Sequence, residues 1–340
     1  MNKKILVTGG AGYIGSHTIV DLLQNGFDVI STDNFSRSSA LSLLGIEKIT
    51  GMKVKNYEID LCNYADIQKV FLENEDIAGI IHFAAYKSVP ESVEFPIRYY
   101  ENNMNSLFNI LKCIEEFEIK NFVFSSSCSV YGNVSELPVT EDTPFSIPEC
   151  AYAASKQMGE QVILDFAKKN TQLNNILLRY FNPVGAHPSA EIGETPIGRP
   201  NNLVPLVTQT AIGILDKMYV WGNDYNTRDG SCIRDYIHVM DIANAHTKAL
   251  QYIMAHNNKS NYEIFNLGSG AGVSVLEVIQ TFEKVSGVKL NYEIAPRRRG
   301  DVEAIYTNIE KAKQLLHWHT QYSLEDMMST AWKWQQKLGK

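Results

Sequence analysis

The stretch Lys4-Ile-Leu-Val-Thr-Gly-Gly-Ala-Gly-Tyr-Ile-Gly15 lies close to the start of the chain and decides its fold. Its first five residues predict an apolar strand, and the apolar pattern of residues 14–24 predicts a helix directly after the glycines. Gly9, Gly12 and Gly15 have the spacing Gly-x-x-Gly-x-x-Gly. Glycines at this place let the backbone approach a pyrophosphate, which the unpaired N–H groups of the helix N-terminus can bind. The stretch therefore predicts a dinucleotide-binding unit of strand, loop and helix.

Apolar strands alternate with helical patterns along the first 180 residues of the chain. Strands that are apolar on both faces and are separated by helices indicate a parallel sheet covered on both sides. We therefore predict an α/β fold, a Rossmann-type doubly wound parallel sheet followed by a smaller mixed α/β lobe. The expected strands span residues 4–8, 27–32, 52–59, 79–83, 121–126 and 175–181, and the expected helices span residues 14–24, 65–73, 96–117 and 152–168.

The chain is long enough, at 340 residues, for about two domains. Residues 183–200 are rich in glycine, proline and polar residues, which indicates a long loop. Helical patterns at residues 203–215 and 241–254 follow this loop, mixed with short strands. We therefore expect a first domain over residues 1–182 and a smaller lobe over residues 183–340, with some segments of the lobe interleaved with the first domain.

Charge and cysteine content narrow the class of protein. A net charge of −7 disfavours nucleic acid or an anionic membrane as the main partner, because both select basic surfaces. The five cysteines are odd in number and scattered, which is typical of a reducing compartment and forms no zinc motif. A strand pattern begins at residue 3, which leaves no room for a signal peptide, and no apolar run reaches the roughly 18 residues of a membrane span. We expect a cytoplasmic protein without nucleic acid or membrane partners.

The ends of the next three strands carry residues suited to a dinucleotide. Asp33 follows the second expected strand, 24 residues after Gly9, where a carboxylate can accept hydrogen bonds from ribose hydroxyls. Because a carboxylate repels a 2′-phosphate, Asp33 favours NAD over NADP, although Arg37 lies nearby in the sequence. Asp60 ends the third strand, and Phe83-Ala84-Ala85-Tyr86-Lys87 ends the fourth with small residues that permit close approach. Ligands of open α/β sheets bind at the carboxyl ends of strands, so these residues belong to one edge.

The segment Tyr152-Ala-Ala-Ser-Lys156 supplies a candidate base at the same edge. Residues four apart share a helix face, so the Lys156 ammonium can lie beside the Tyr152 phenol. A phenol titrates near pH 10, and a base at neutral pH needs this pKa lowered by roughly 3 units, which a neighbouring cation and an oxidised nicotinamide can supply. Ser125-Ser126-Ser127 ends the fifth strand, where a hydroxyl can bond the substrate oxygen that exchanges its proton with Tyr152.

Several longer motifs carry a family resemblance. Besides the glycine-rich stretch and the Tyr-x-x-x-Lys pair, they are Ser125-Ser-Ser-Cys-Ser-Val-Tyr-Gly132, Leu178-Arg-Tyr-Phe-Asn-Pro-Val-Gly-Ala-His-Pro188 and Arg234-Asp-Tyr-Ile-His-Val-Met-Asp241. With these motifs the chain resembles the extended short-chain dehydrogenase/reductase family, and within it the UDP-glucose 4-epimerases, essentially from end to end. The resemblance implies that UDP-glucose and UDP-galactose are interconverted by oxidation at C4 with tightly bound NAD, rotation of the 4-keto sugar and return of the hydride to its opposite face.

The resemblance also implies roles for individual residues. Tyr152 removes the proton from the sugar O4, Ser127 orients the same oxygen, and Lys156 lowers the Tyr152 pKa while it holds the nicotinamide ribose. Residues 1–182 would then bind NAD and residues 183–340 the UDP-sugar. The expected cofactor-binding residues are Gly9, Gly12, Tyr13, Ile14, Gly15, Asp33, Asn34, Ser36, Arg37, Ser38, Asp60, Leu61, Phe83, Ala84, Ala85, Lys87, Asn102, Tyr152, Lys156 and Phe181.

The smaller lobe must then hold a diphosphate, a uracil and a hexose. Arginine suits the diphosphate because its planar fork binds two oxygens at once, and Arg234 and the run Arg297–Arg299 are the candidates. By the resemblance, Arg298 and Asp301 contact the diphosphate and ribose, whereas the basic Arg299 replaces a residue that is often acidic. The expected substrate-binding residues are Lys87, Ser127, Tyr152, Asn182, Asn202, Leu203, Tyr219, Val220, Trp221, Arg234, Arg298, Asp301 and Ile305.

Ile305 departs from the pattern of better-known bacterial relatives, some of which carry a bulky aromatic residue at the wall of the hexose pocket. Relatives with smaller residues there tend to accept N-acetylated sugars too. Isoleucine is smaller than tyrosine but β-branched and stiff. We therefore expect UDP-glucose and UDP-galactose to be the main pair, with weak activity on UDP-N-acetylglucosamine and UDP-N-acetylgalactosamine.

Other functions stay open at this point. A 4,6-dehydratase of the same fold places an acid pair just after the serine segment, where this chain has Cys128-Ser129 and no carboxyl group. A decarboxylating relative needs a glucuronate-binding arginine, which the sequence does not test. A dinucleotide sensor without catalysis is disfavoured by the intact Tyr152–Lys156 pair. A metal enzyme has little support, because His317 and His319 are expected on a surface turn.

The family commonly forms homodimers through the long helices that follow the fourth and fifth strands. Residues 96–117 and 152–168 correspond to these helices, so a homodimer is expected.

Overall fold

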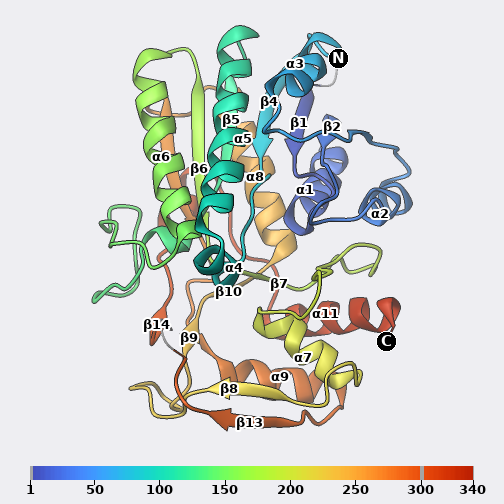
Figure 1. Ribbon diagram of the computed structural model, residues 1–340, viewed down its shortest axis with the longest axis vertical. Coiled ribbons are helices and arrows are strands. Elements are labelled where there is room, and N and C mark those ends of the chain that lie inside the picture. The colour runs from blue at the N-terminus through green and yellow to red at the C-terminus, as the bar shows by residue number, and fades with distance from the viewer. Residues whose placement is uncertain (1–2, 299–301, 340) are drawn as a thin grey trace.

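The computed structural model describes residues 3–298 and 302–339, and a parallel sheet forms its centre (Figure 1). Within these residues the sheet has seven strands in the order β11-β6-β5-β4-β1-β2-β3, and each neighbouring pair is parallel. The predicted doubly wound sheet is therefore confirmed. Its strands are β1 (Lys4–Thr8), β2 (Asp28–Thr32), β3 (Lys55–Tyr57), β4 (Ile77–His82), β5 (Asn121–Ser127), β6 (Asn174–Tyr180) and β11 (Tyr262–Leu267).

Helices cover both faces of the sheet and bury two apolar cores against it. On one face, α1 (Tyr13–Gln24) and α8 (Val239–Met254) pack on each other and on the sheet. The other face is covered by α3 (Tyr64–Leu72), α5 (Pro96–Glu116) and α6 (Ala151–Lys169). The apolar strands lie between two layers of helices and have no water-exposed face, which explains their nearly continuous hydrophobic sequence.

The structure differs most from the predicted elements in one strand that is shorter than expected and in two helices that were not expected. The strand expected over residues 52–59 is only β3, because β3 is the last strand of the sheet and pairs with β2 alone. The sequence reasoning did not anticipate α2 (Leu41–Thr50) or α4 (Val89–Glu94). Gly45, a poor helix former, lies inside α2 where the helix packs closely, since a Cβ added there would lie 2.4 Å from the Glu191 carbonyl oxygen.

The smaller lobe lies below the carboxyl ends of the strands (Figure 1). Its own core packs helices against a two-stranded sheet of β8 and β13. Two small sheets connect it to the main one: β10 pairs with β7, and β9 lies between β12 and β14. The elements are β7 (Asn182–Val184), α7 (Leu203–Ala211), β8 (Met218–Trp221), β9 (Ile233–Arg234), β10 (Tyr236–His238), β12 (Val273–Ser274), α9 (Val275–Ser286), β13 (Tyr292–Ala295), β14 (Ala304–Ile305), α10 (Glu310–Leu315) and α11 (Leu324–Leu338).

Two segments beyond residue 182 belong to the main sheet and its covering layer. Strand β11 pairs with β6 over six residues, and α8 packs on β5 and β6. The chain therefore returns to the first layer after it has started the lobe. The division into domains at residues 182 and 183 stays a prediction.

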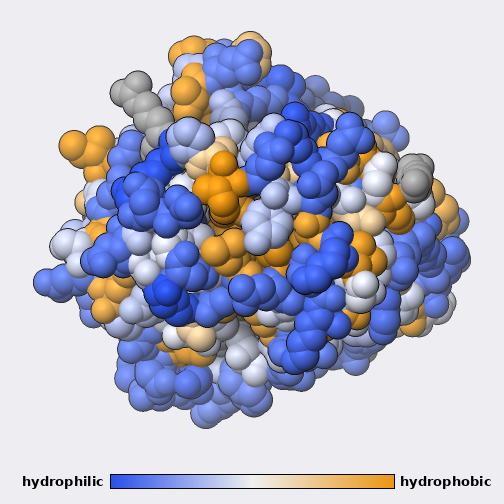
Figure 2. Space-filling view, turned by 90° about the horizontal axis from the view of Figure 1, so that it is seen from below, coloured by the Kyte–Doolittle hydropathy of each residue, from blue (hydrophilic) through white to orange (hydrophobic). Residues whose placement is uncertain are grey.

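The surface seen from below is mostly hydrophilic, with small groups of hydrophobic residues between the polar ones (Figure 2). Trp221 of β8 and Ile294 of β13 are among the exposed apolar side chains of this lobe. Scattered apolar groups of this kind are normal for a folded surface. A search of the described residues finds no helix that combines the length and apolar character needed to cross a membrane.

Candidate active site

The glycine loop after β1 is pressed against the end of β4. Gly9 has φ +68°, and a Cβ added there would lie 2.9 Å from the Ala84 nitrogen. A Cβ added at Gly15 would lie 2.3 Å from the Gly9 carbonyl oxygen, so the first turn of α1 tolerates no side chain at that point. Gly12 occupies the N-cap position and contributes no capping side chain. The loop is thus a tight backbone cradle at the N-terminus of α1, beside Tyr13 and Ile14.

This cradle lies where the strand order reverses. From β1 the chain builds β2 and β3 on one side of the sheet, and it then places β4 on the other side of β1. The crevice outside such a point is the usual ligand site of open α/β sheets. Phe83, Ala84 and Ala85 directly follow β4 and border the same crevice.

Asp33 ties the loop after β2 to the glycine loop. Its carboxylate accepts from the backbone N–H of Ala11 at 3.1 Å, from the N–H of Phe35 at 2.9 Å and from the Ser38 hydroxyl at 2.7 Å. Asn34, Ser36 and Arg37 are exposed on this loop. The Arg37 guanidinium forms an ion pair with Glu91 and lies over the Tyr86 ring at 4.9 Å. A 2′-phosphate at Asp33 would therefore have to draw Arg37 away from a carboxylate, which supports the choice of NAD.

The remaining cofactor candidates line the same edge. Asp60 is exposed and accepts from the Cys62 N–H at 2.9 Å, and Leu61 beside it is buried. Asn102 of α5 donates to the side-chain oxygen of Asn103 at 3.0 Å. The sequence reasoning missed Asn103, whose amide also bonds both backbone groups of Tyr86 and the Ser155 hydroxyl. Asn103 therefore joins α5, the loop after β4 and α6.

Ser127, Tyr152 and Lys156 come together where β5 ends and α6 begins. Cys150 caps α6, so Tyr152 lies in its first turn and Lys156 one turn later. Lys156 is 5 % exposed, and its ammonium donates to the carbonyl oxygen of Ser125 at 2.6 Å. The Ser127 hydroxyl accepts from the Ser129 N–H at 3.2 Å and interacts with the Tyr152 phenol. The structure thus brings the predicted hydroxyl and phenol into contact, and it places the ammonium at Ser125, two residues earlier on the same strand.

The electrostatics of this cluster differ from the sequence-based expectation. Burial raises the pKa of Tyr152, nearby Tyr180 adds to the rise, and the bond with Ser127 opposes it. Burial lowers the pKa of Lys156 to about 8, and the Glu160 carboxylate opposes that shift. Since a buried phenolate is costly, the protein alone does not lower the pKa of Tyr152, and a base at neutral pH needs further positive charge beside the phenol.

Glu194 joins the cofactor edge to the smaller lobe. The ammonium of Lys87 lies 3.2 Å from the Glu194 carboxylate, and the Asn202 amide donates to the same oxygen at 3.1 Å. Asn202 precedes α7, whose first residue is Leu203. No local sequence pattern indicated Glu194, because it lies in an irregular loop of residues 188–201. The contact brings Lys87 and Asn202, both expected at the substrate, to the same oxygen of one carboxylate.

Arg234 and Ile305 lie opposite each other on paired strands. Strands β9 and β14 are parallel, with Ile305 in register with Arg234. The Arg234 guanidinium donates to the carbonyl oxygens of Ile233 at 2.8 Å and Val302 at 2.7 Å. Ile305 is 7 % exposed and packs in a small core with Phe181, Tyr131 and others, partly against Cys128. Cys128 directly follows Ser127 in the chain, which supports a place for Ile305 at the wall of the sugar site.

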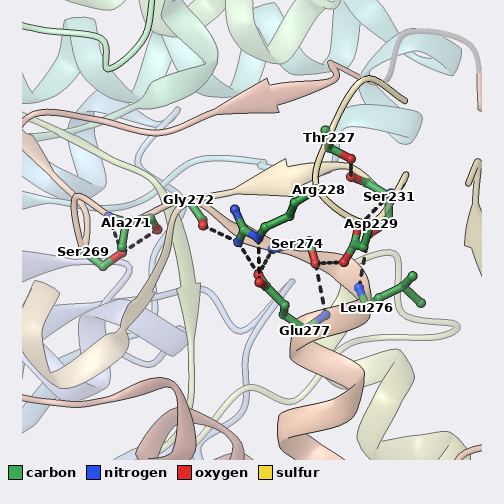
Figure 3. Close-up of polar contacts among 10 residues, drawn as sticks. All are labelled: Thr227, Arg228, Asp229, Ser231, Ser269, Ala271, Gly272, Ser274, Leu276 and Glu277. Atoms are coloured by element: carbon green, nitrogen blue, oxygen red, sulfur yellow. Dashed lines mark hydrogen bonds and ion pairs between the residues drawn. The ribbon is translucent and has the colours of Figure 1, made fainter. Parts of the chain in front are cut away.

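A polar network holds the strand that carries Arg234. Ser274 of β12 pairs with Ile233 and caps α9 together with Glu277 (Figure 3). Arg228 forms an ion pair with Glu277 and donates to the Gly272 carbonyl at 2.7 Å. Asp229 accepts from the backbone and hydroxyl of Ser231 at 2.9 and 2.8 Å, and also from the Ser274 hydroxyl. The loop before β9 is therefore fixed to the N-terminus of α9.

The other residues expected at the substrate lie on β7, on β8 and in the segment after β13. Tyr219 and Trp221 share one face of β8, with ring centroids 5.8 Å apart, while Val220 between them points into the core. Asn182 begins β7, directly after the buried Phe181. Arg298 is exposed beyond β13, and Asp301 and Arg299 lie outside the described residues. Within the described ranges, no three His, Cys, Asp or Glu side chains are arranged to hold a metal ion.

Comparisons with known proteins agree with this site. A family model described as GDP-mannose 4,6 dehydratase matches residues 6–331. A UDP-glucose 4-epimerase of Bacillus subtilis is 46 % identical over 331 residues, which cover 97 % of this chain and 96 % of that protein. The family model is named after a dehydratase, but this chain lacks the acid pair that a 4,6-dehydratase places after the serine segment, since Cys128-Ser129 follows Ser127 here.

Solved structures give the same result. The UDP-glucose 4-epimerase of Bifidobacterium longum, in complex with NAD+ and UDP, is 45 % identical with a TM-score of 0.93, and 98 % of each chain is covered. The enzyme of Stenotrophomonas maltophila, with bound NAD and formylated UDP-arabinopyranose, is 40 % identical with a TM-score of 0.96 and 99 % coverage of each chain. Sequence, fold and site geometry together show that this chain belongs to the UDP-glucose 4-epimerase family of the extended short-chain dehydrogenases/reductases.

Proposed function

We propose that this protein interconverts UDP-glucose and UDP-galactose with a tightly bound NAD. The observation that carries the proposal is the meeting of β5 and α6, where Ser127 contacts Tyr152 and the Lys156 ammonium donates to the Ser125 carbonyl oxygen. Its second support is the pair of strands β9 and β14, which brings Arg234 and Ile305 toward the same place from the smaller lobe. The dehydratase alternative lacks its acid pair at Cys128-Ser129.

The residues at the edge of the sheet fit NAD. Gly9 and Gly15 leave a cradle that a Cβ would fill, and Gly12 leaves the N-terminus of α1 uncovered by a side chain. Asp33 would bind the adenosine ribose, and Asp60, Asn102 and the backbone of Phe181 would border the adenine and nicotinamide ends. When bound, NAD accepts the hydride from the sugar C4 and returns it.

The protein moves the proton of the reaction. Tyr152 takes the O4 proton as C4 is oxidised, and the Ser127 hydroxyl orients that oxygen. Lys156 would add positive charge near the phenol, and the oxidised nicotinamide of bound NAD would supply the further positive charge that a lower Tyr152 pKa requires. The 4-keto sugar then turns over in the pocket, and Tyr152 returns the proton after hydride addition to the opposite face.

The smaller lobe would hold the UDP-sugar while this happens. Arg234 and Arg298 would bind the diphosphate, Asp301 the ribose, and Tyr219 and Trp221 would flank the uracil. Asn182, Asn202, Leu203 and Val220 complete the expected pocket. In this proposal residues 1–182 bind NAD and residues 183–340 bind the nucleotide sugar, except that α8 and β11 complete the first layer.

We also propose a cytoplasmic homodimer. The outer sides of α5 and α6 expose Ile97 (65 %), Phe108 (38 %) and Met158 (46 %), and the two helices pack side by side. The five cysteines are all unpaired, which suits a reducing compartment. Light scattering of the eluted protein tests the dimer: Phe108→Glu should yield a monomer, and a monomeric wild type would refute it.

The test of function is an incubation of the purified protein with UDP-galactose and no added NAD. Proton NMR of the sugar anomeric signals should show UDP-glucose accumulating toward an equilibrium mixture. Acid-denatured protein should release NAD, because a cofactor regenerated in each turnover stays bound. No conversion, even after NAD is added, would refute the proposal, and a 4-keto-6-deoxy product would favour the dehydratase.

A further inference from the structure

A buried ion pair lies beneath the Ser–Tyr–Lys cluster, and the proposed reaction does not use it directly. Glu160 of α6 is 1 % exposed and Arg179 of β6 is 3 % exposed. The guanidinium meets both carboxylate oxygens, with Nε at 3.0 and 3.2 Å and Nη2 at 2.7 Å. Two charges removed from water are costly to keep in a core, and an apolar pair of similar volume would often be as stable. Stability alone therefore does not explain why this ion pair is present.

The position of Glu160 connects it to the candidate catalytic residues. Tyr152, Lys156 and Glu160 follow one another at intervals of four residues and so share one face of α6. The facing strand β5 offers three consecutive serines to these residues. The Lys156 ammonium donates to the Ser125 carbonyl at 2.6 Å, the Ser126 hydroxyl donates to the Glu160 carboxylate, and Ser127 interacts with Tyr152. Glu160 thus completes a row of three contacts between helix and strand.

Arg179 holds this carboxylate in place from the next strand. Ser126 and Arg179 are in register on β5 and β6. The second side of the guanidinium donates to the Tyr131 hydroxyl at 2.9 Å and to the Glu141 carbonyl oxygen at 3.1 Å. With three bonds from Arg179 and one from Ser126, the Glu160 carboxylate has little freedom to turn. Its charge is consequently fixed one helical turn behind Lys156.

The other groups around Lys156 supply no comparable negative charge. On its own helix it faces Tyr152 and Glu160, and on β4 it faces His82, whose pKa burial lowers to about 3. On β6, Arg179 pairs with Glu160, and Tyr180 bonds the hydroxyl of Ser125, whose carbonyl oxygen binds the ammonium. Burial raises the pKa of that tyrosine to about 12. His82 and Tyr180 are therefore neutral at physiological pH, and Arg179 is positive. Glu160 is the carboxylate that acts on the Lys156 ammonium among the described residues.

We propose that Glu160 is a positioning residue for the reaction, which Arg179 and Ser126 fix so that Lys156 stays an ammonium directed at the end of β5. This inference rests on the proposed function, since it acts through Lys156 on Tyr152. It adds a residue that touches neither the sugar nor the cofactor. Without the carboxylate, Lys156 is expected to lose its proton at lower pH, and Tyr152 then loses the neighbouring cation.

The experiment separates this role from a structural one by removing both charges together. Glu160→Gln alone leaves Arg179 buried without its anion and is expected to melt at lower temperature. The double variant Glu160→Gln/Arg179→Met keeps the volume and the acceptor for Ser126 and has no unpaired charge. Glu263→Gln is the matched control, because Glu263 is also a buried glutamate of the main sheet layer, on β11.

Two measurements are made on each protein as purified. The titration of Lys156 is followed by NMR of [13C]lysine-labelled protein without substrate, with the signal assigned from Lys156→Arg. The pH dependence of kcat and KM is then measured with UDP-galactose. In the double variant the Lys156 midpoint and the alkaline loss of kcat should both move down by about one pH unit. KM should stay the same, and the control should match the wild type.

A double variant that is folded and keeps the wild-type midpoint and kcat would overturn the proposal and leave the pair a structural role only. An equal fall of kcat in the control would also overturn it. The titration needs no substrate, so it tests Glu160 even if the protein does not convert UDP-galactose. Failure of the proposed function is therefore distinguishable from failure of this inference.

Discussion

At the scale of single residues, the chemistry depends on side chains that burial makes costly to ionise. Tyr152 and Lys156 are both enclosed, and burial moves each pKa toward the neutral form. In the proposed reaction, an ammonium near a phenolate would stabilise both charges in this region of low polarity. Small changes in this cluster should therefore alter the rate more than the binding of the sugar nucleotide.

Replacement of Tyr152 by phenylalanine should abolish most of the activity. Loss of a positioned acid–base group typically lowers a rate by about 10²–10⁴-fold, so kcat for UDP-galactose should fall by that factor. The amount of NAD released on denaturation should stay the same. Tyr252→Phe, a change at another buried tyrosine, is the control and should be fully active. Activity within twofold of wild type in Tyr152→Phe would contradict the assignment.

Ile305 is expected to limit the size of the sugar. In Ile305→Ala, removal of the side chain next to Phe181 should raise kcat/KM for UDP-N-acetylglucosamine relative to UDP-galactose by about tenfold. The same change should cost about 2–5 kcal/mol of stability. Ile279→Ala in the core of the smaller lobe should cause a similar loss of stability with no change in the substrate ratio. An unchanged ratio in Ile305→Ala would show that this residue does not border the sugar.

At the scale of elements, short backbone segments decide where the ligands can lie. The glycine loop and the first turn of α1 are packed backbone against backbone, and the strand β9 is fixed by the network around Ser274 and Glu277. In both cases a regular element holds one end of an irregular segment. The candidate site is therefore built from loop ends that the sheet and α9 keep rigid.

Gly15→Ala should release the cofactor. The new Cβ would fall 2.3 Å from the Gly9 carbonyl oxygen, and this oxygen belongs to the backbone, so the cradle itself must shift. We expect purified Gly15→Ala to contain little NAD and to need added NAD for activity. Gly26→Ala serves as the control, because nothing lies within 4 Å of an added Cβ there; its φ of +81° disfavours a side chain and should lower stability without affecting NAD content. Equal NAD content in the two variants would contradict the cradle.

At the scale of the whole molecule, the layered core encloses several titratable groups. Burial lowers the pKa of His17 and His82 to about 3 and that of His238 and His246 to about 4. These values lie below the pKa of an unfolded histidine, so acid favours the unfolded chain. The stability from each histidine is complete above pH 6.5 and decreases as the pH falls toward the folded pKa.

The protein should accordingly lose stability between pH 7 and pH 5. Each neutral histidine accounts for about 2 kcal/mol over this interval, at 1.36 kcal/mol per unit below pH 6.5. Asp241 acts in the opposite sense, because burial raises its pKa to about 6, and it offsets part of the loss. Urea unfolding should give a free energy of unfolding that is several kcal/mol lower at pH 5 than at pH 7. This difference should be smaller in His246→Gln and unchanged in His319→Gln, a variant at an exposed site. Equal stability at pH 5 and pH 7 would refute this explanation.

The sequence by itself determined the parallel sheet apart from β11, and it predicted candidate residues at the ends of its strands. Strand β1 begins and ends as predicted, and the helices expected after β1, β3, β4 and β5 differ by one residue at their ends. Apolar periodicity and glycine spacing are local properties, and the order of the chain then brings the strand ends to one edge. The identities of Ser127, Tyr152 and Lys156 as candidates could be read from such local patterns.

Only the tertiary structure decided which side chains hold these candidates in place. Glu160, Arg179, Asn103 and Glu194 gave no signal in the sequence, because a buried ion pair or a bridging amide depends on contacts between segments far apart in the chain. The return of α8 and β11 to the main layer was likewise left open, since an apolar strand can pair with any available edge. The direction of the Tyr152 pKa was set by the depth of burial, which local sequence does not encode.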